Sequence, residues 1–184
     1  STNHQRNLHS LELNLDGTGK SEIHTGGDLD HMLTLFARHG DFDLTVRCQV
    51  HQVDDHHSVE DIGICLGQAF TQALGDKRGI TRYGQFLLPW MRPWCCAPAI
   101  SAAGITWLAV DLPSPKVGTF DTELAKEFSW PLSGLPLLLH FRQLSGENTH
   151  HILEAIFKGA GRTLKMAVAP DCTHAGEIPS TKGM

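Results

Sequence analysis

Two copies of one short motif constrain this chain more than any other feature. Each is a pair of adjacent histidines with a glutamate three residues after the second, namely His56-His57-Ser58-Val59-Glu60 and His150-His151-Ile152-Leu153-Glu154. The copies lie 94 positions apart in a chain of 184 residues. The same order of expected elements (strand, helix, strand, motif, helix) surrounds both copies. This repeat predicts an internally duplicated α+β fold, in which sheets pack against helices.

Hydrophobic periodicity sets the expected elements of both halves. In the first half, strands are expected over residues 11–16 and 42–50, and helices over residues 30–40 and 62–74. In the second half, strands are expected over residues 106–112 and 137–144, and helices over residues 121–128 and 152–164. Asp30 is expected to cap the first helix and Gly40 to end it, because these residue types favour those positions.

The length favours one domain over residues 1–184, which is enough chain for a sizeable core. We expect this domain to consist of two similar halves, at about residues 1–88 and 104–168. Residues 169–184 carry prolines and glycines with few apolar side chains. We interpret them as a frayed C-terminal tail.

Composition excludes several classes of protein. A net charge of −5 and a pI near 6.1 argue against a general nucleic-acid binder. The longest uncharged run, residues 93–110, contains Pro98 and Gly104 and falls short of the ~20 apolar residues of a membrane-spanning helix. The five cysteines are odd in number and form no C-x-x-C motif, so no disulfide framework is expected. We therefore predict a soluble protein of a reducing cytoplasm.

The two motifs are typical of metal ligands. On a helix, the first histidine and the glutamate lie four residues apart and share a face, whereas the second histidine points about 100° away. The second histidine cannot easily bind the same ion as its neighbours. The two copies therefore predict a pair of metal centres that share the ligands of the two motifs. Imidazole with carboxylate suits Mn, Fe or Zn better than Ca or Mg. A neighbouring subunit could complete such split ligand sets.

Further segments extend the pattern beyond the two motifs. They are Asn14-Leu15-Asp16-Gly17-Thr18-Gly19, Asp30-His31-Met32-Leu33, Ala37-Arg38-His39-Gly40, Asp54-Asp55-His56-His57, Gly75-Asp76-Lys77-Arg78-Gly79-Ile80 and Gly146-Glu147-Asn148-Thr149-His150-His151. Together they resemble the imidazoleglycerol-phosphate dehydratase family of histidine biosynthesis, over most of residues 11–168. The resemblance implies a ribosomal protein S5 domain 2-like arrangement, trimers assembled into a 24-subunit shell, and a dimanganese site at subunit contacts.

The resemblance also implies a set of metal ligands and a set of substrate contacts. The ligands of two Mn²⁺ ions per active site would be His31, His56, His57, Glu60, Glu127, His150, His151 and Glu154. The contacts to a small phosphate substrate would be His31, His39, Arg82, Lys158, Ser180 and Lys182. Ser180 and Lys182 would give the C-terminal tail a role in binding the substrate phosphate, which prefers Lys, Arg and hydroxyl donors.

The implied reaction removes water from imidazole glycerol phosphate and forms imidazole acetol phosphate. It takes a weakly acidic C–H proton beside the ring and expels a hydroxyl group. Two metal ions suit this reaction because each can bind one ring nitrogen as a Lewis acid. Glu154 and Glu60 are the candidates for moving protons.

The chain departs from the family's pattern in two places. The family carries a glutamate about ten residues before its D-G-T-G turn, and Arg6, which cannot accept a proton, stands there instead. Residues 90–103 replace a Pro-Met-Asp-Glu-Ala segment and a strand that ends on a phosphate-binding arginine, whose position falls near Ala103. The prolines and tryptophans of this stretch are expected to fit a central strand poorly.

A shift of reading frame by one base would account for both departures. Codons for Trp90 to Ala97, with one base restored in front, can encode Met-Asp-Glu-Ala-Leu-Val-Leu-Cys. Codons for Asn3 to Ser10, read one base later, can encode Ile-Thr-Asn-Glu-Thr-Ser-Ile. Codon degeneracy allows this choice, so frame slips are a hypothesis. A DNA read that encodes residues 90–98 as written would contradict it.

Three functions are therefore compatible with the sequence. The leading one is a metal-dependent carbon–oxygen lyase. The second is a non-catalytic relative that still binds metal and assembles, because the departures affect a base and a phosphate anchor. The third is a metal-dependent hydrolase that uses the same ligands to activate water. The lyase predicts tight binding of flat azoles across the two metals, and the hydrolase does not.

Overall fold

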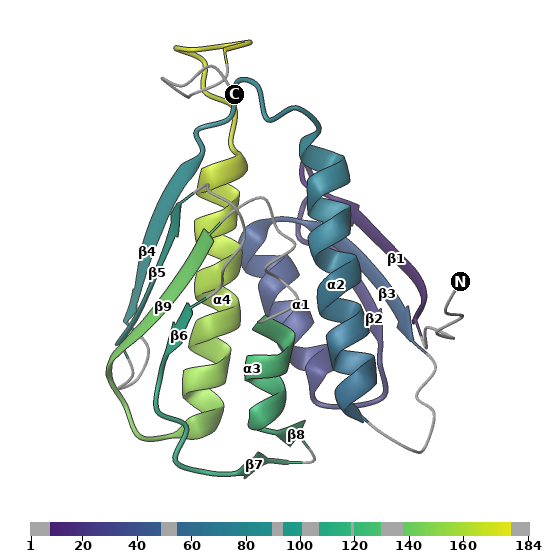
Figure 1. Cartoon of the computed structure of the whole chain (residues 1–184), viewed down its shortest axis with the longest axis vertical. Coiled ribbons are helices and arrows are strands. Elements are labelled where there is room, and N and C mark those ends of the chain that lie inside the picture. The colour runs from purple at the N-terminus through teal and green to yellow at the C-terminus, as the bar shows by residue number, and fades with distance from the viewer. Residues whose placement is uncertain are drawn as a thin grey trace.

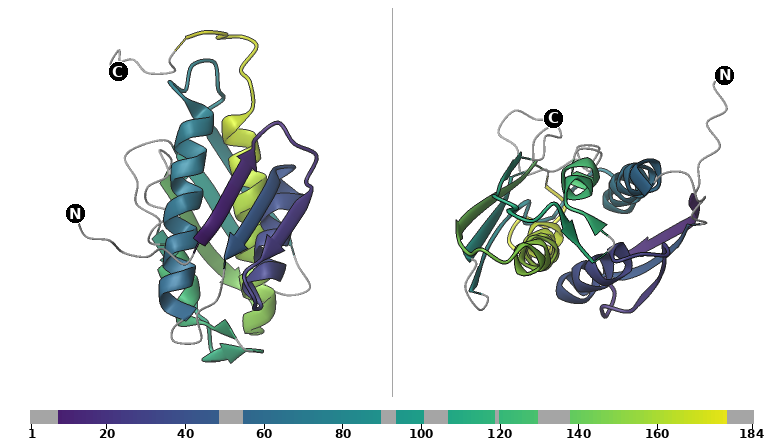
Figure 2. Two further views of the ribbon diagram at one scale, coloured as in Figure 1. Left: turned by 90° about the vertical axis from the view of Figure 1, so that its right-hand side faces the viewer. Right: turned by 90° about the horizontal axis from the view of Figure 1, so that it is seen from below.

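A computed structural model describes residues 8–48, 55–89, 94–100, 107–118, 120–129 and 138–177. Across these ranges the helices form a central layer, with one sheet against each side (Figure 1, Figure 2). α4 (Thr149–Val168) packs on the second sheet and on α1 (Leu29–Gly40), which contacts the first sheet. α2 (Asp55–Leu74) and α3 (Glu123–Ser129) complete the layer. The expected packing of sheets against helices is confirmed.

Alternating apolar residues build the first sheet, whose strand order is β1-β3-β2. β3 (Asp43–Cys48) buries Leu44 and Val46 in the core, whereas Arg47, which follows Val46, is exposed. β1 (Leu8–Asn14) pairs with it antiparallel and β2 (Ser21–His24) pairs with it parallel. The strands expected over residues 11–16 and 42–50 are confirmed, whereas β2 was not expected.

The second sheet repeats this pairing with one strand added. Its order is β4 (Tyr83–Pro89), β5 (Trp94–Ile100), β9 (Leu138–Ser145) and β6 (Trp107–Ala109). β9 has β5 as an antiparallel neighbour and β6 as a parallel one, as β3 has β1 and β2. The internally duplicated α+β fold is therefore confirmed. A two-stranded ribbon of β7 (Lys116–Val117) and β8 (Phe120–Asp121) leads into α3.

The two long helices carry the repeat most clearly. α2 and α4 each have 20 residues, and both their first and their last residues lie 94 positions apart, the offset of the two motifs. Each H-H-x-x-E motif therefore lies in the first turns of its helix. The helices expected from residues 62 and 152 begin earlier than predicted, because the polar motif residues belong to them.

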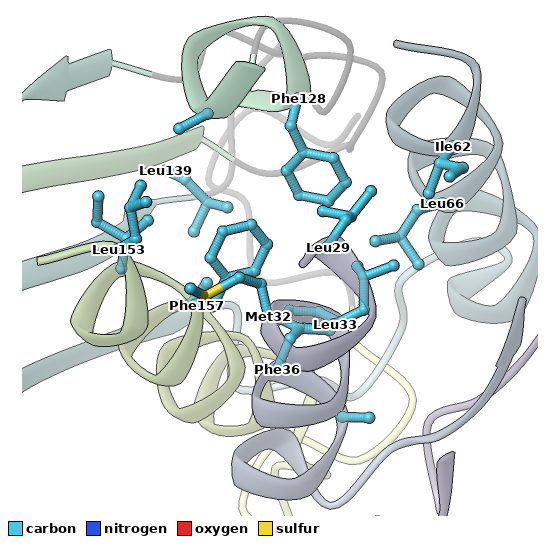
Figure 3. Packing of buried hydrophobic residues seen from close by; sticks show 14 of the residues in the cluster. Leu29, Met32, Leu33, Phe36, Ile62, Leu66, Phe128, Leu139, Leu153 and Phe157 are labelled. Carbon is cyan, nitrogen blue, oxygen red and sulfur yellow. The ribbon is translucent and has the colours of Figure 1, made fainter. Parts of the chain in front are cut away.

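The core lies among the helices (Figure 3). α1 presents Leu29, Met32, Leu33 and Phe36, which lie between side chains of α4 and of α2 in this view. At ~25 cal/mol per Å² of apolar surface, such clusters supply most of the free energy that stabilises a domain of this size. The phenyl ring of Phe36 also lies 5.6 Å from that of Phe42, centroid to centroid, so α1 is joined to the start of β3.

A glycine allows α1 and α4 to approach closely. A Cβ atom at Gly161 of α4 would lie 2.5 Å from the carbonyl oxygen of Phe36 and 2.8 Å from the amide nitrogen of Gly40. Both distances are below any normal van der Waals contact. Only glycine therefore fits at this crossing.

The D-G-T-G turn has a structural role. The carboxylate of Asp43 accepts hydrogen bonds from the amides of Thr18 (2.8 Å) and Lys20 (3.0 Å). Gly19 has φ +81° and lies against the backbone of Arg38 on α1. The turn between β1 and β2 is thus tied to both β3 and α1.

The expected cap of α1 is wrong. Asp28 occupies the N-cap position and makes no side-chain cap hydrogen bond, while Asp30 lies inside the first turn. The carboxylate of Asp30 instead accepts hydrogen bonds from the amide (2.7 Å) and hydroxyl (2.5 Å) of Thr25. The helix does end at Gly40, but the left-handed residue after it is Asp41, with φ 53°.

The expectation that residues 94–100 fit a central strand poorly is also wrong. They form β5, which pairs with β4 on one side and β9 on the other. The register shifts between Trp94 and Cys95, so the strand begins with an irregularity that loosens its pairing there. Arg6, Ala103 and residues 90–93 lie outside the described residues, so the frame-slip hypothesis stays a prediction.

The interpretation of the C-terminal segment as frayed is wrong for residues 169–177. The amide of Gly79 donates to the carbonyl of Glu177 (2.9 Å), and the amide of Asp171 donates to the carbonyl of Gly79 (2.8 Å). Ile80 also forms a β-bridge with Pro170. Backbone bonds thus hold this segment on the loop between α2 and β4. In the described part of the chain, no helix is both long and apolar enough to cross a bilayer.

Gly161→Ala tests the α1–α4 crossing. The added methyl group meets backbone atoms that cannot move independently, so we expect the free energy of unfolding to fall by about 1–3 kcal/mol. Urea unfolding measures this. Gly27→Ala is the control, because nothing lies within 4 Å of a Cβ at that position. Equal unfolding midpoints for the two variants would contradict the close crossing.

Candidate metal centre

The first turns of α1 and α4 bring three predicted ligands together. Nε2 of His31 lies 3.0 Å from Oε1 of Glu154, and Nε2 of His150 lies 3.2 Å from the same oxygen. The two imidazole rings stack, with centroids 6.0 Å apart and planes at 8°. One ligand atom from each residue falls within 4.8 Å of the others. His150 and Glu154 share a helix face as their spacing predicted, and His31 joins them from another element.

The residues of this cluster fit a transition-metal ion. Two imidazoles and one carboxylate suit Mn, Fe or Zn. The His31 and His150 side chains are about half exposed, at 51% and 42%, whereas that of Glu154 is 11% exposed. The cluster thus has a buried carboxylate at its base and an open side toward solvent, where further ligands or a substrate can enter.

Glu154 is held as a carboxylate. Burial acts to raise its pKa, but hydrogen bonding to His31 and Lys158, with the charges of Lys158 and His150, overcomes this and lowers the pKa to about 2. Nζ of Lys158 lies 2.9 Å from Oε2 of Glu154, one helical turn away. Glu154 therefore carries its negative charge throughout the neutral range.

Polar bonds at the start of α4 set the position of its histidines. The side chain of Asn148 is the N-cap and accepts a hydrogen bond from the amide of His151 (3.0 Å). The buried hydroxyl of Thr149 accepts another from the amide of Ser114 (3.0 Å). The G-E-N-T-H-H segment thus caps the helix and ties it to the loop between β6 and β7, which orients His150.

Comparisons with known proteins agree with this geometry. A family model described as imidazoleglycerol-phosphate dehydratase matches residues 25–164. The chain belongs to the imidazoleglycerol-phosphate dehydratase family. The resemblance inferred from the sequence is confirmed, and with it the class of hydro-lyases.

Individual members of this family cover nearly the whole chain. The imidazoleglycerol-phosphate dehydratase of Desulforamulus reducens is 52% identical over 180 residues, 95% of this chain and 90% of that protein. That of Jannaschia sp. is 51% identical over 181 residues, 95% and 91% of the two chains. The crystal structure of the Staphylococcus aureus dehydratase matches with a TM-score of 0.80 and 36% identity, over 87% of this chain and 93% of that one. The crystal structure of the Pyrococcus furiosus protein matches with a TM-score of 0.76 and 35% identity, over 95% of this chain and 93% of that one.

The other ligands expected from the dehydratase family lie apart from this cluster. His56, His57 and Glu60 are on the first turns of α2, where His57 and Glu60 are exposed. His56 is half-buried and lines a cavity of about 540 Å³ beside Asp111 and Asp121. Within the described ranges, only His31, His150 and Glu154 form a group of three or more ligands.

Two further expected ligands have different positions. The ring of His151 lies edge-on to that of His150, 6.0 Å away between centroids, and is not part of the three-residue group. Glu127 lies on α3, and its side chain is outside the described residues. In the second motif His150 therefore belongs to the three-residue group and His151 does not, while the assignment of adjacent histidines to different ions stays a prediction.

The expected substrate contacts are also distributed along the molecule. The amide of Arg82 donates to the carbonyl of Ala167 (2.7 Å), which lies about 20 Å along α4 from Glu154. Arg82 adopts φ 71°, a left-handed conformation rare for arginine. Ser180 and Lys182 lie outside the described residues. Within one chain, Arg82 therefore lies far along α4 from the candidate metal cluster.

His39 lies near the far end of α1 from His31. Burial lowers the pKa of His39, and the charges of Arg162, Lys158 and Arg38 lower it further. The lowered pKa favours the uncharged imidazole, which can form hydrogen bonds but carries no charge.

Sequence reasoning missed two interactions around the site that local signals could have found, namely the Glu154–Lys158 ion pair and the Asn148 cap. The Glu154–Lys158 pair has the i,i+4 spacing of a helix ion pair. Asn148 precedes the motif by two residues, at the place where an N-cap is expected. The contact of His31 with Glu154 had no such local signal.

Asn148→Ala tests the positioning of the histidines. Losing the cap lowers the free energy of unfolding by about 1 kcal/mol. The first turn then holds His150 less firmly, so we expect Mn²⁺ affinity to fall about tenfold. Urea unfolding and isothermal titration calorimetry measure the two effects. Asn148→Asp keeps a cap acceptor and is the control, so equal losses in both variants would contradict the role of the cap.

Proposed function

We propose that this chain dehydrates imidazole glycerol phosphate to imidazole acetol phosphate in histidine biosynthesis, as a metal-dependent hydro-lyase. The observation that carries the proposal is the cluster of His31, His150 and Glu154, in a member of a dehydratase family. Two Mn²⁺ ions per active site are the proposed cofactor, because imidazole with carboxylate suits this ion. The cytoplasm is the proposed location. In the described part of the chain, Cys48, Cys65 and Cys172 form no disulfide, which is compatible with that location.

We propose that each active site is shared between copies of the chain. The α1–α4 contact holds His31, His150 and Glu154, whereas the expected ligands of the α2 motif form a separate set. The Arg82 backbone is also bonded to the far end of α4. A second copy that brings its α2 motif to the cluster would complete the ligands, with Glu127 and His151 as further members. A shell of 24 subunits built from trimers is the proposed assembly.

In the proposed reaction, the side chains of the chain have separate tasks. When bound, the metal ions supply Lewis-acid polarisation and a template for the ring. Glu154, with a pKa of about 2, is a weak base, so it suits holding a metal better than accepting a proton. Glu60 is exposed and is the proposed proton acceptor. Arg82, with Ser180 and Lys182, is proposed to bind the phosphate.

Turnover of imidazole glycerol phosphate with added Mn²⁺ tests the activity. We expect activity that a chelator removes and Mn²⁺ restores. Glu154→Gln should lower kcat at least about 100-fold, since it removes a charged ligand. Glu147→Gln is the control, because Glu147 is exposed in the loop before α4. An assembled, metal-bound protein without turnover would contradict the catalytic proposal and leave a non-catalytic metal binder.

Mixing two inactive variants tests the shared site. His57→Ala removes a ligand from α2, and His150→Ala removes one from α4. If each site draws on two copies, shells reassembled from equal amounts regain roughly a quarter of the wild-type activity, from sites with both intact sets. Each variant reassembled alone is the control. A mixture that stays as inactive as its components would contradict the shared site.

A further inference from the structure

Lys158 is buried beside the metal cluster. Only 5% of the residue is exposed, although it carries a charge. Lysine is almost never buried to this degree without a partner of opposite charge. Its Nζ atom donates to Oε2 of Glu154 over 2.9 Å, and Glu154 is itself 8% exposed. The two residues form a buried ion pair within one turn of α4.

The two oxygens of Glu154 face different partners. Oε2 accepts the hydrogen bond of Lys158, whereas Oε1 faces Nε2 of His31 and Nε2 of His150. Turning both oxygens toward the imidazoles would break the ion pair with Lys158. The carboxylate therefore presents one oxygen, Oε1, to the two imidazole rings.

We propose that Lys158 is a positioning residue that holds Glu154 as a one-oxygen metal ligand and supplies its counter-charge until the metal binds. This inference rests on the proposed metal site. The ammonium group holds Oε2 of Glu154, so Oε1 stays directed toward the two imidazoles and the site needs little rearrangement to accept an ion. It also balances a buried negative charge that would otherwise destabilise the metal-free fold. Once a metal ion binds, that ion takes over part of this role.

Lys158→Met tests the counter-charge, because methionine fills similar space without charge. Measured on the full assembled chain after chelation, its melting temperature should fall by about 5–10 °C relative to wild type. Added Mn²⁺ should restore most of that loss, since the ion compensates Glu154. Lys165→Met is the control: Lys165 lies further along α4, is exposed and pairs with Asp41, so its loss should matter little with or without metal.

The double variant Glu154→Gln/Lys158→Met keeps the test decisive if Lys158→Met does not fold. Removing both charges leaves no uncompensated carboxylate, so the double variant should melt nearer to wild type than Lys158→Met does. X-ray absorption of the Mn²⁺-loaded proteins tests the geometry. We expect one-oxygen carboxylate coordination by Glu154 in wild type and two-oxygen coordination in Lys158→Met.

Three outcomes would overturn the positioning role. They are a metal-free Lys158→Met protein as stable as Lys165→Met, a loss of stability that Mn²⁺ does not reduce, or no rescue by the double variant. These readouts do not depend on turnover. A wild-type protein that Mn²⁺ does not stabilise would instead contradict the proposed metal site, while the chelated proteins would still test the ion pair.

Discussion

The contact between α1 and α4 is the interaction on which the rest of the structure depends. The two helices lie side by side between the sheets (Figure 1, Figure 2). Each carries part of the candidate metal cluster. Gly161 sets their separation, because a larger residue would clash with the backbone of Phe36 and Gly40. The apolar packing of Leu29, Met32 and Leu33 stabilises the same contact (Figure 3). A shift of α1 away from α4 by the width of a methyl group would also separate His31 from Glu154.

Hydrogen bonds and an ion pair position the side chains of the candidate site on these packed helices. The hydrogen bonds from Thr25 to Asp30 anchor the first turn of α1 beside His31, and Asn148 caps the first turn of α4 beside His150. The ion pair of Lys158 with Glu154 holds the third ligand from behind. Each ligand thus has a neighbour that limits its motion, as effective metal sites require.

The duplication places equivalent motifs on α2 and α4, but only one of them meets a third ligand within the described chain. The two sheets repeat the same pairing, so the difference between the motifs arises from their surroundings. His150 and Glu154 face α1, where His31 is within reach. The shared site proposed above would bring the two motifs together by association of two copies, and so would link the proposed catalysis to the proposed assembly.

The sequence by itself determined the duplicated plan, the type and order of most elements, the family, and the pairing of His150 with Glu154. These follow from local periodicity and from spacings within one helix, which need no tertiary information. It did not reveal β2, β4 or β5, because β2 has only four residues and the sequences of β4 and β5 do not alternate between apolar and polar residues. Tertiary structure decided that His31 joins Glu154, that Asp30 binds Thr25 instead of capping α1, and that residues 169–177 are held on the loop before β4. Those outcomes depend on contacts between residues far apart in the chain, and only the packing of helices and sheets brings them together.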